Sequence, residues 1–416
     1  MTNYTIKNPI KRIPVGMLLN RRIYYISSPI GLISKVRKEY DCNEAFGVMR
    51  IVSYVRIAQK QYCDGKNLYA NISRDVLRAC AGDKYRTYID WLIENKIIEV
   101  NESYSSEKHY TKSYRYTDKA YNKSLSVTKW EIDVLQQTSE KYNERLQETI
   151  FTPNGQYDNE LLYCLEHENL LSVPNPEEII DTLQDEDKSY ASEWFYEINK
   201  GQCFPTPQEK STRFYFNSIM MSSNLRKHLI YNKKETLINY DIKTAYPAFT
   251  KLLAMLPQYK DNIPTIPTYV SAILIGATIK NENGTLCFDF YNKGDFYDSL
   301  MSDTNMTRKQ CKMEYNKYTN SNDAEYKRNH IFTNKLISMG HGDMAEYIIQ
   351  ANNIWLILEA METAVMVWVC NECIDKQVPF IRQHDGFITT SDSLYDIEEI
   401  LSRHFGKIFT FKASNL

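Results

Sequence analysis

Two short stretches govern the interpretation of this sequence: INYDIKTAYP at residues 238–247 and FIRQHDGFI at residues 380–388. In each stretch a short apolar run typical of a β-strand leads to an aspartate, Asp241 in the first and Asp385 in the second. Two carboxylates delivered by adjacent strands can hold two divalent cations close together, and such a pair catalyses in-line attack at phosphorus. We therefore expect the two aspartates to converge on one metal site.

A pair of cations lies between the two aspartates in the sequence. Arg308 and Lys312 are four residues apart, so on a helix they share one face and are suited to gripping a triphosphate. Each feature taken alone also has an ordinary structural interpretation. Asp241 could cap a helix, Asp385-Gly386 could form a hairpin turn, and the cation pair could be a solvated helix face. The order of the features along one chain favours the catalytic interpretation.

The charge distribution points to a polyanionic partner for the first third of the chain. The 416 residues carry a formal net charge of −2, yet residues 1–130 contain 23 Lys and Arg against 12 Asp and Glu. A basic segment followed by an acidic remainder is typical of contact with nucleic acid. The length leaves room for two or three domains with a sizeable core.

The nine cysteines are scattered, and no pair of CxxC motifs with zinc-ligand spacing occurs. We expect reduced, mostly buried thiols. The N-terminal residues lack the apolar segment of a secretory signal, and the apolar run at 355–370 is interrupted by Glu359 and Glu362. The expectation is a cytoplasmic protein with no membrane partner.

The pattern predicts an α+β protein in four parts. Residues 1–42 form a basic segment on which no fold is imposed, and residues 119–205 form a helical, acidic connector or thumb-like region. Residues 43–118 have the order of a winged helix-turn-helix: a helix over 45–62, a second helix capped by Ser73, a third from Lys84, then two strands. Residues 206–416 predict a palm-like sheet with helical fingers, including one long helix over 345–373.

The stretch at 85–100 resembles the junction between recognition helix and wing in winged-helix replication and regulatory proteins. The third helix would then enter a DNA groove, and cations of the helix and wing would contact the backbone. The residues expected at this interface are Lys84, Arg86, Lys108, Lys112 and Arg115.

The last 210 residues or so resemble the catalytic core of family A DNA polymerases. Residues 211–215 and 224–227 look like the elements that precede motif A, and residues 237–247 look like motif A itself. Arg308-x-x-x-Lys312 is similar to the start of the motif B helix, and His384-Asp385 is similar to motif C, which single-subunit RNA polymerases of phage type share. The chain departs from the family at Gly386, where glutamate is usual, and it lacks the motif B Tyr-Gly ending.

This resemblance implies a metal site and a nucleotide site. Asp241, Asp385 and the backbone carbonyl of Ile242 would hold two Mg²⁺ ions, with Mn²⁺ as a substitute. Arg308 and Lys312 would hold the triphosphate. The remaining roles fall to residues around the cleft: Tyr315 and Tyr318 stacking on the nascent base pair, Arg213 and Arg226 binding phosphates or bracing the acids, and His384 orienting the primer terminus.

Tyr246 lies five residues after Asp241, where the family has the residue that packs under the sugar. A bulky side chain there excludes a 2′-hydroxyl. The sequence therefore predicts a template-directed DNA polymerase of a phage, plasmid or similar element, with primed DNA and dNTPs as partners. A primase or compact RNA polymerase with the same palm is the first alternative, and a non-enzymatic winged-helix replication initiator or regulator is the second.

Overall fold

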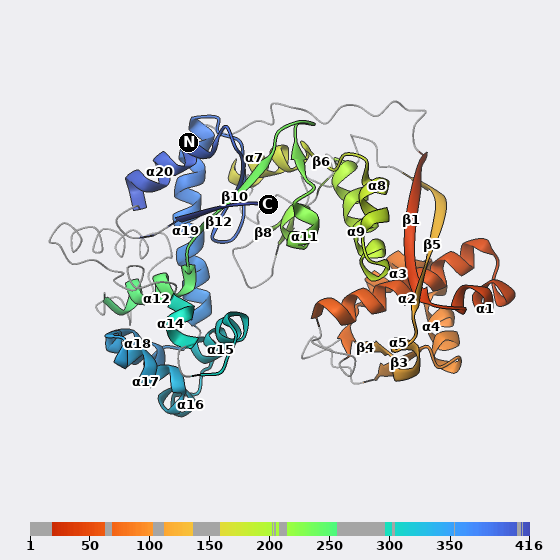
Figure 1. Ribbon diagram of the computed structural model, residues 1–416, viewed down its shortest axis with the longest axis horizontal. Helices are drawn as coiled ribbons and strands as arrows, with labels where there is room; N and C mark the ends of the chain where they lie inside the picture. The colour runs from red at the N-terminus through yellow and green to blue at the C-terminus, as the bar shows by residue number, and fades with distance from the viewer. Residues whose placement is uncertain are drawn as a thin grey trace. The chain divides into compact units, whose positions relative to one another are not determined.

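The structure is a computed structural model that describes residues 19–62, 69–102, 112–135, 159–201, 203, 205–207, 214–255, 296–301, 304–352, 354–405, 409 and 411–416. Helices and small antiparallel sheets alternate along these residues, so the expected mixed α and β composition is confirmed. The chain divides into two units, drawn in Figure 1. Unit 1 comprises residues 1–10, 143–174 and 201–416, and unit 2 comprises residues 11–142 and 175–200. The domain boundaries drawn from the sequence stay a prediction.

Unit 2 packs helices around a three-stranded sheet with the order β2-β4-β3. Its elements are β1 (Leu19–Pro29), α1 (Leu32–Glu39), α2 (Cys42–Tyr62), β2 (Ala70–Asn71), α3 (Arg74–Ala81), the 3₁₀ turn η1 (Gly82–Lys84), α4 (Tyr85–Glu94), β3 (Ile98–Asn101), β4 (Ser113–Tyr116), α5 (Asp118–Tyr121), β5 (Leu125–Leu135), α8 (Pro176–Thr182) and α9 (Asp185–Asn199).

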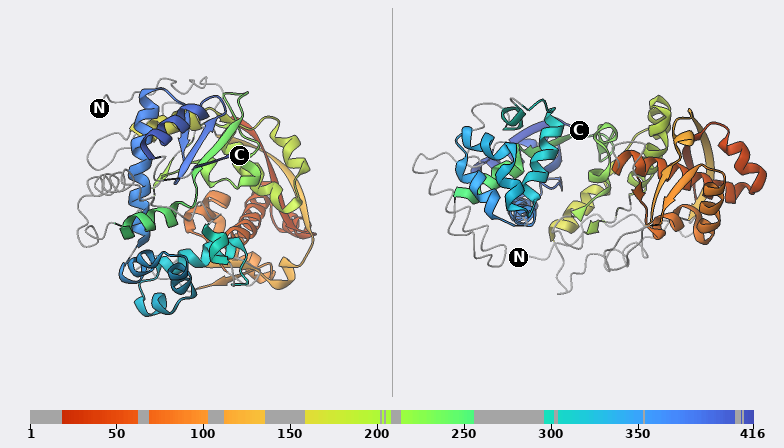
Figure 2. Two further views of the ribbon diagram at one scale, coloured as in Figure 1. Left: turned by 60° about the vertical axis from the view of Figure 1, so that its left-hand side comes forward. Right: turned by 90° about the horizontal axis from the view of Figure 1, so that it is seen from below.

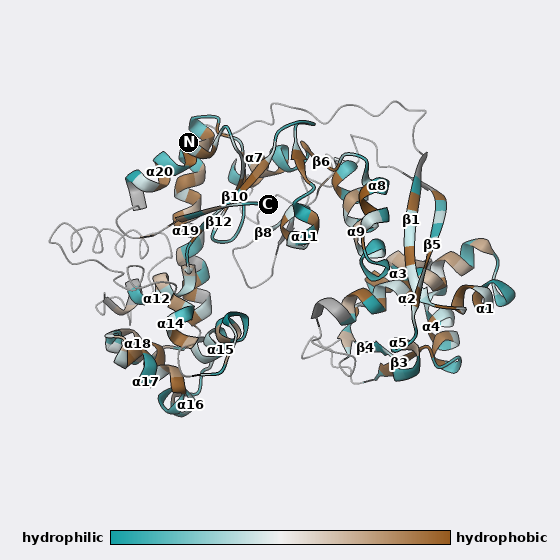
Figure 3. Cartoon of the chain, in the orientation of Figure 1, coloured by the Kyte–Doolittle hydropathy of each residue, from teal (hydrophilic) through white to brown (hydrophobic). Residues whose placement is uncertain are grey.

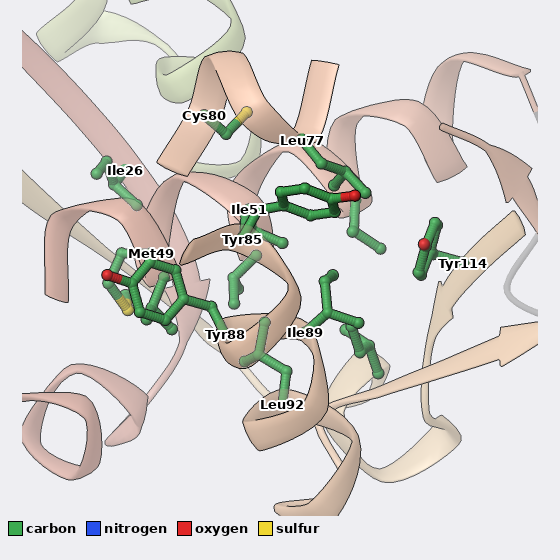
Figure 4. Packing of buried hydrophobic residues seen from close by; sticks show 14 of the residues in the cluster. Ile26, Met49, Ile51, Leu77, Cys80, Tyr85, Tyr88, Ile89, Leu92 and Tyr114 are labelled. Atoms are coloured by element: carbon green, nitrogen blue, oxygen red, sulfur yellow. The ribbon is translucent and has the colours of Figure 1, made fainter. Parts of the chain in front are cut away.

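Local sequence signals account for the helices of unit 2. Val48, Val52 and Val55 recur at helical spacing on α2 and are fully buried, which fixes the face that α2 turns to the core. The Ser73 side chain accepts a hydrogen bond from the Val76 amide and so caps α3 as expected. The α3 helix ends at Gly82, whose φ of 66° favours glycine. Figure 4 shows side chains of α2, α3 and α4 meeting in this core.

Two long strands of unit 2 differ from the expectation. β1 and β5 pair antiparallel over their whole length, from Leu19 with Leu135 to Pro29 with Leu125. The sequence left residues 1–42, which contain β1, without an assigned fold, and it predicted helices for residues 119–205, which is wrong at β5. The partners lie about a hundred residues apart in the sequence, and a local pattern does not reveal such a pairing.

Unit 1 contains the sheet that carries Asp241. Its elements are α7 (Asn159–Glu168), β6 (Leu171–Ser172), β7 (Thr206–Pro207), β8 (Phe214–Tyr215), α10 (Asn217–Met220), α11 (Ser223–Arg226), β9 (Ile230–Tyr231), β10 (Leu237–Ile242), α12 (Ala245–Met255), α14 (Phe296–Met301), α15 (Arg308–Asn320), α16 (Ala324–Asn329), α17 (Ile331–Ser338), α18 (Gly342–Gln350), α19 (Ile354–Asp375), β11 (Phe380–Arg382), β12 (Gly386–Thr390), α20 (Leu394–Phe405) and β13 (Phe411–Asn415).

The sheet of unit 1 is antiparallel with the order β11-β12-β10-β13. Helices α7 and α19 contact β11, and Figure 2 shows α19 running alongside the sheet. The buried Arg382 of β11 donates hydrogen bonds to Glu160 of α7 at 2.7 Å and to Thr363 of α19 at 3.1 Å. These bonds anchor β11 immediately before the turn that carries Asp385.

The helix expected over residues 345–373 is two helices. α18 ends at Gln350, where the backbone of Ala351 turns extended, and α19 begins at Ile354. The Ala351 carbonyl accepts a hydrogen bond of 2.7 Å from the buried Lys327 ammonium, which satisfies an acceptor at the end of the helix. Brown, apolar residues dominate α19 in Figure 3. Within the described part of the chain, no helix combines the length and apolar character that crossing a bilayer requires.

Candidate active site

The sheet of unit 1 brings the two aspartates together. Asp241 pairs in register with Gly386 of β12, and the Asp385 carbonyl accepts a hydrogen bond of 2.8 Å from the Ile242 amide. Asp385 lies in the turn between β11 and β12. It therefore occupies a hairpin turn, as Asp385-Gly386 alone would suggest, and it also lies beside Asp241. Two residues separated by 144 positions in the sequence thus lie at the end of adjacent strands.

The surroundings of Asp241 disfavour its charge in the absence of a cation. Burial raises the pKa of the carboxyl to about 6, and the neighbouring charge of Asp385 acts in the same direction. The Asn239 hydrogen bond and the charges of Arg226 and Lys412 lower it. A bound cation would relieve both unfavourable effects, since it would neutralise the repulsion between the two acids.

A cavity of about 730 Å³ opens at the aspartates. Arg308 and Lys312 lie in its lining at i, i+4 spacing on α15, as the sequence predicted for a helix. The helix begins at a capping box in which Thr307 accepts a hydrogen bond from the Gln310 amide and the Gln310 side chain accepts one from the Thr307 amide. This cap fixes the first turn of α15, where Arg308 lies. The Arg308 guanidinium also lies 5.5 Å from the centre of the Tyr297 ring.

The donor set fits a magnesium site of the kind that substrate completes. One buried oxygen of Asp241, Oδ1, has no hydrogen-bond partner among the residues that the structure describes. Among the described residues, no cluster of three or more His, Cys, Asp and Glu side chains could enclose a metal. Mg²⁺ is commonly held by one or two carboxylates together with substrate phosphates and water, and not by a cage made wholly of protein. Asp241, Asp385 and the carbonyl of Ile242 match that requirement in oxygen type.

Tyr246 and His384 also line the cavity. The His384 ring meets the Tyr215 ring edge to face, with centroids 4.6 Å apart. Arg226 lies close enough to Asp241 for its charge to lower the pKa of that carboxyl. Arg213 lies outside the described residues. The roles assigned to Tyr246, His384 and the two arginines stay predictions.

Tyr315 and Tyr318 require a correction. Both are fully buried, and both pack against Phe332 in the core of the helical group. The Tyr318 hydroxyl lies 2.8 Å from the Thr333 hydroxyl. Neither ring lines the cavity, so neither is placed to stack on a base. Helical periodicity explains the error, because the buried Cys311, Tyr315 and Tyr318 recur at the spacing of a core stripe, which runs beside the stripe that carries Lys312.

Outside the stretch at 238–247, further residues line the cavity that were not expected there from the sequence: Tyr297, Asn316, Glu362, Phe411 and Lys412. Two of them carried a usable signal. Asn316 continues the spacing of Arg308 and Lys312 by one more turn, and Glu362 is an acid inside an otherwise apolar helix. Lys412 pairs with Asp241 in the β10–β13 register, and only that register reveals its position.

The cations expected at the interface of unit 2 are largely engaged with acids. Lys84 bonds Glu44 at 2.6 Å, Arg115 bonds Glu99 at 2.6 Å, and Lys112 pairs with Glu102. Arg86 is exposed on α4 and its guanidinium donates to the Tyr85 hydroxyl at 3.1 Å. Lys108 lies outside the described residues. Paired cations offer less net charge to a phosphate, so the interface is less basic than the residue count suggested.

No protein-family description and no curated protein matches the chain. Among solved structures, the POL domain of Pol1 from M. smegmatis in complex with DNA primer-template and dNTP is similar at a TM-score of 0.27 and 9% sequence identity. The alignment covers 94% of this chain and 66% of that structure. A likeness at this TM-score does not establish a shared fold.

Proposed function

We propose that the chain is a template-directed DNA polymerase that transfers nucleotides with the help of divalent cations at Asp241 and Asp385. The observation that carries the proposal is the shared cavity of this acid pair and the α15 cations Arg308 and Lys312. Carboxylates suit the cations, and the cationic helix suits a triphosphate. Among ordinary substrates, nucleoside triphosphates match both halves of such a cavity.

Each group has a task in this proposal. Mg²⁺ bound at the two carboxylates would activate the primer hydroxyl and stabilise the departing pyrophosphate. Arg308 and Lys312 would orient the triphosphate and offset the charge that builds up on its oxygens. Tyr246 would pack against the sugar, and His384 would contact the primer terminus. Because phosphoryl transfer depends mainly on positioning, the fixed first turn of α15 would contribute directly to the rate.

We further infer that unit 2 contacts DNA. Helices α2 and α4 contact strands of the sheet β2-β4-β3, and α3 packs on α2 and α4. This order of helices followed by a β3–β4 hairpin supports the expectation of a winged helix-turn-helix. Arg86 is exposed on α4 and forms no ion pair with an acid of the described chain. It is therefore the best candidate for a phosphate contact.

Primer extension with the purified full-length chain tests the proposal. A primed DNA template is supplied with Mg²⁺ and either dNTPs or rNTPs. We expect incorporation of dNTPs, with Asp241→Asn and Asp385→Asn each slowing it by about 10²–10³-fold or more. Asp392→Asn removes the same charge at an exposed position after β12 and should leave the rate unchanged.

The other outcomes are equally informative. A preference for rNTPs by the unmodified chain would favour the primase or RNA polymerase alternative. Tyr246→Ala should raise the use of rNTPs relative to dNTPs if the ring excludes the 2′-hydroxyl. Duplex binding without incorporation of either nucleotide would favour the initiator or regulator alternative and would refute the proposal.

A further inference from the structure

A chain of side-chain hydrogen bonds ends at Asp241. The Gln383 amide nitrogen donates to Asn239 Oδ1 at 2.6 Å, and the Asn239 amide nitrogen donates to Asp241 Oδ2 at 2.5 Å. All three side chains are half-buried. The proposed reaction assigns no role to Asn239 or Gln383.

These two hydrogen bonds, from Gln383 to Asn239 and from Asn239 to Asp241, form a relay that joins the two segments carrying the acids. Asn239 and Asp241 are two residues apart on β10, so their side chains share one face of the sheet. Gln383 begins the turn that carries Asp385, and its backbone amide donates to the Gly386 carbonyl at 2.8 Å. A movement of the turn relative to β10 would break the relay.

The relay also dictates which way the Asn239 amide faces. Its oxygen accepts from Gln383, so its NH₂ group must point at the Asp241 carboxylate. Without Gln383 the amide could rotate by half a turn and present its oxygen to the carboxylate, which is repulsive. Gln383 therefore acts on Asp241 through Asn239.

The two oxygens of Asp241 are consequently not equivalent. Oδ2 accepts a hydrogen bond from Asn239, whereas Oδ1 is buried and has no partner in the described part of the chain. A buried acceptor left without a donor costs free energy, which a bound cation would recover. Groups that hydrogen-bond a metal ligand fix its orientation, and their loss typically weakens metal binding about 10–100-fold.

We propose that Asn239 and Gln383 are positioning residues that hold the Asp241 carboxylate in the orientation in which it binds a divalent cation. This inference rests on the proposed function, because it concerns the same cation site. In this proposal the relay keeps β10 and the Asp385 turn in the relative position that cation binding requires.

The test measures Mn²⁺ binding to the full-length chain by electron paramagnetic resonance, with no nucleotide present, alongside the Mg²⁺ concentration that gives half-maximal primer extension. We expect Asn239→Ala to raise both the Mn²⁺ dissociation constant and that Mg²⁺ concentration about 10–100-fold, and Gln383→Ala to raise them less. The double variant should be no weaker than Asn239→Ala, because the two residues act in series.

Three controls separate positioning from packing. Asn239→Leu keeps the side-chain volume without the amide, so it should bind Mn²⁺ as weakly as Asn239→Ala if the hydrogen bond matters. Ser414→Ala alters the residue that pairs with Asn239 in the β10–β13 register and should change nothing. Asp241→Asn should abolish binding. Circular dichroism and thermal unfolding establish that each variant is folded.

The failures are distinguishable. If the unmodified chain binds Mn²⁺ and loses it with Asp241→Asn, but Asn239→Ala and Gln383→Ala bind as the unmodified chain does, the positioning inference is wrong and the proposed function stands. If Asn239→Leu binds Mn²⁺ as tightly as the unmodified chain does, Asn239 contributes only packing, and the positioning inference is likewise wrong. If the unmodified chain neither binds Mn²⁺ nor extends a primer, both the inference and the proposed function fail.

Discussion

At the scale of single residues, the position of Gly386 admits only glycine because two strands approach each other closely. A Cβ atom at this position would lie 2.4 Å from the Tyr240 carbonyl oxygen and 2.5 Å from Asp241 Oδ1. Strand β10 approaches so closely that no side chain fits, and the glutamate usual after the motif C aspartate is excluded here. Asp241 and Asp385 could be identified from the sequence. The need for glycine at position 386 follows only from the β10–β12 register, which places Gly386 opposite Asp241.

Gly386→Ala should therefore damage the site. Because the nearest atoms include backbone atoms of β10, the strands must shift, and we expect the free energy of unfolding to fall by about 1–3 kcal/mol. Primer extension should be lost even at temperatures where the variant is folded, since Asp241 is displaced. Gly342→Ala is the matched control, because a Cβ atom at that position would meet open space. Chemical denaturation and primer extension measure the two effects, and normal values for Gly386→Ala would contradict the close approach.

Glu168 should make stability depend on pH. Burial raises the pKa of this carboxyl to about 7, although hydrogen bonds from Ser218 oppose the shift. The folded chain thus keeps a proton that the unfolded chain loses above its ordinary pKa of 4.5. Its contribution to stability is fully present below pH 4.5 and is lost as the pH rises through about 7.

The variant Glu168→Gln isolates this contribution. Between pH 4.5 and 7, the original chain should lose about 2–3 kcal/mol of its free energy of unfolding relative to the variant. His167 acts in the opposite direction, because burial lowers its pKa to about 4, and its contribution is lost as the pH falls from 6.5. It is common to both proteins and cancels in the difference. Parallel pH profiles of the two proteins would show that Glu168 is not protonated in the folded state.

At the scale of elements, predictions succeeded where a local signal sets the structure. The apolar run that leads to Asp241 forms a strand, β10, as predicted, and Ser73 caps α3 as predicted. The errors lie where distant parts of the chain meet: β1 and β5 pair across about a hundred residues, and the helix expected over 345–373 is interrupted at Ala351, whose carbonyl accepts a hydrogen bond from Lys327. The burial of Tyr315 and Tyr318 belongs to this group, since the side of α15 that faces the core depends on helices elsewhere in the chain.

The cap of α15 offers a test at this scale. Thr307→Ala removes the side chain that receives the Gln310 amide, which should cost about 1 kcal/mol of stability and fray the turn that carries Arg308. The KM for the nucleoside triphosphate should rise more than kcat falls, because triphosphate binding depends on Arg308. Lys309→Ala, on an exposed residue of the same turn, is the control. An unchanged KM for Thr307→Ala in steady-state kinetics would contradict the proposed role of Arg308 in binding the triphosphate.

At the scale of the whole molecule, the division into units could not be derived from the sequence. Unit 2 joins residues 11–142 to residues 175–200, so α9 returns to pack on β1 after the chain has entered unit 1. The buried Arg22 of β1 bonds Glu193 of α9 at 2.5 Å. Because unit 2 is assembled from two separated segments, no single boundary along the sequence delimits it.

If unit 2 contacts DNA and unit 1 carries the proposed site, DNA binding and nucleotide incorporation should be separable by substitution. Arg86→Ala should weaken the binding of duplex DNA several-fold at low salt and reduce the salt dependence by about one phosphate contact, while incorporation on saturating primer–template stays normal. Asp385→Asn should leave the binding of duplex DNA unchanged and greatly slow incorporation. Lys119→Ala, on the exposed side of α5, serves as the control for a lost surface charge. Fluorescence anisotropy over a series of salt concentrations measures binding, and unchanged binding by Arg86→Ala would exclude α4 from the DNA interface.

The proposed chemistry depends above all on divalent cations bound between the two aspartates. Anomalous diffraction from crystals grown with Mn²⁺, primed DNA and a non-hydrolysable dNTP locates such ions directly. We predict anomalous peaks in contact with the carboxylates of Asp241 and Asp385, with the triphosphate against Arg308 and Lys312. Mn²⁺ bound only elsewhere, or a triphosphate bound away from α15, would refute a two-aspartate catalytic site.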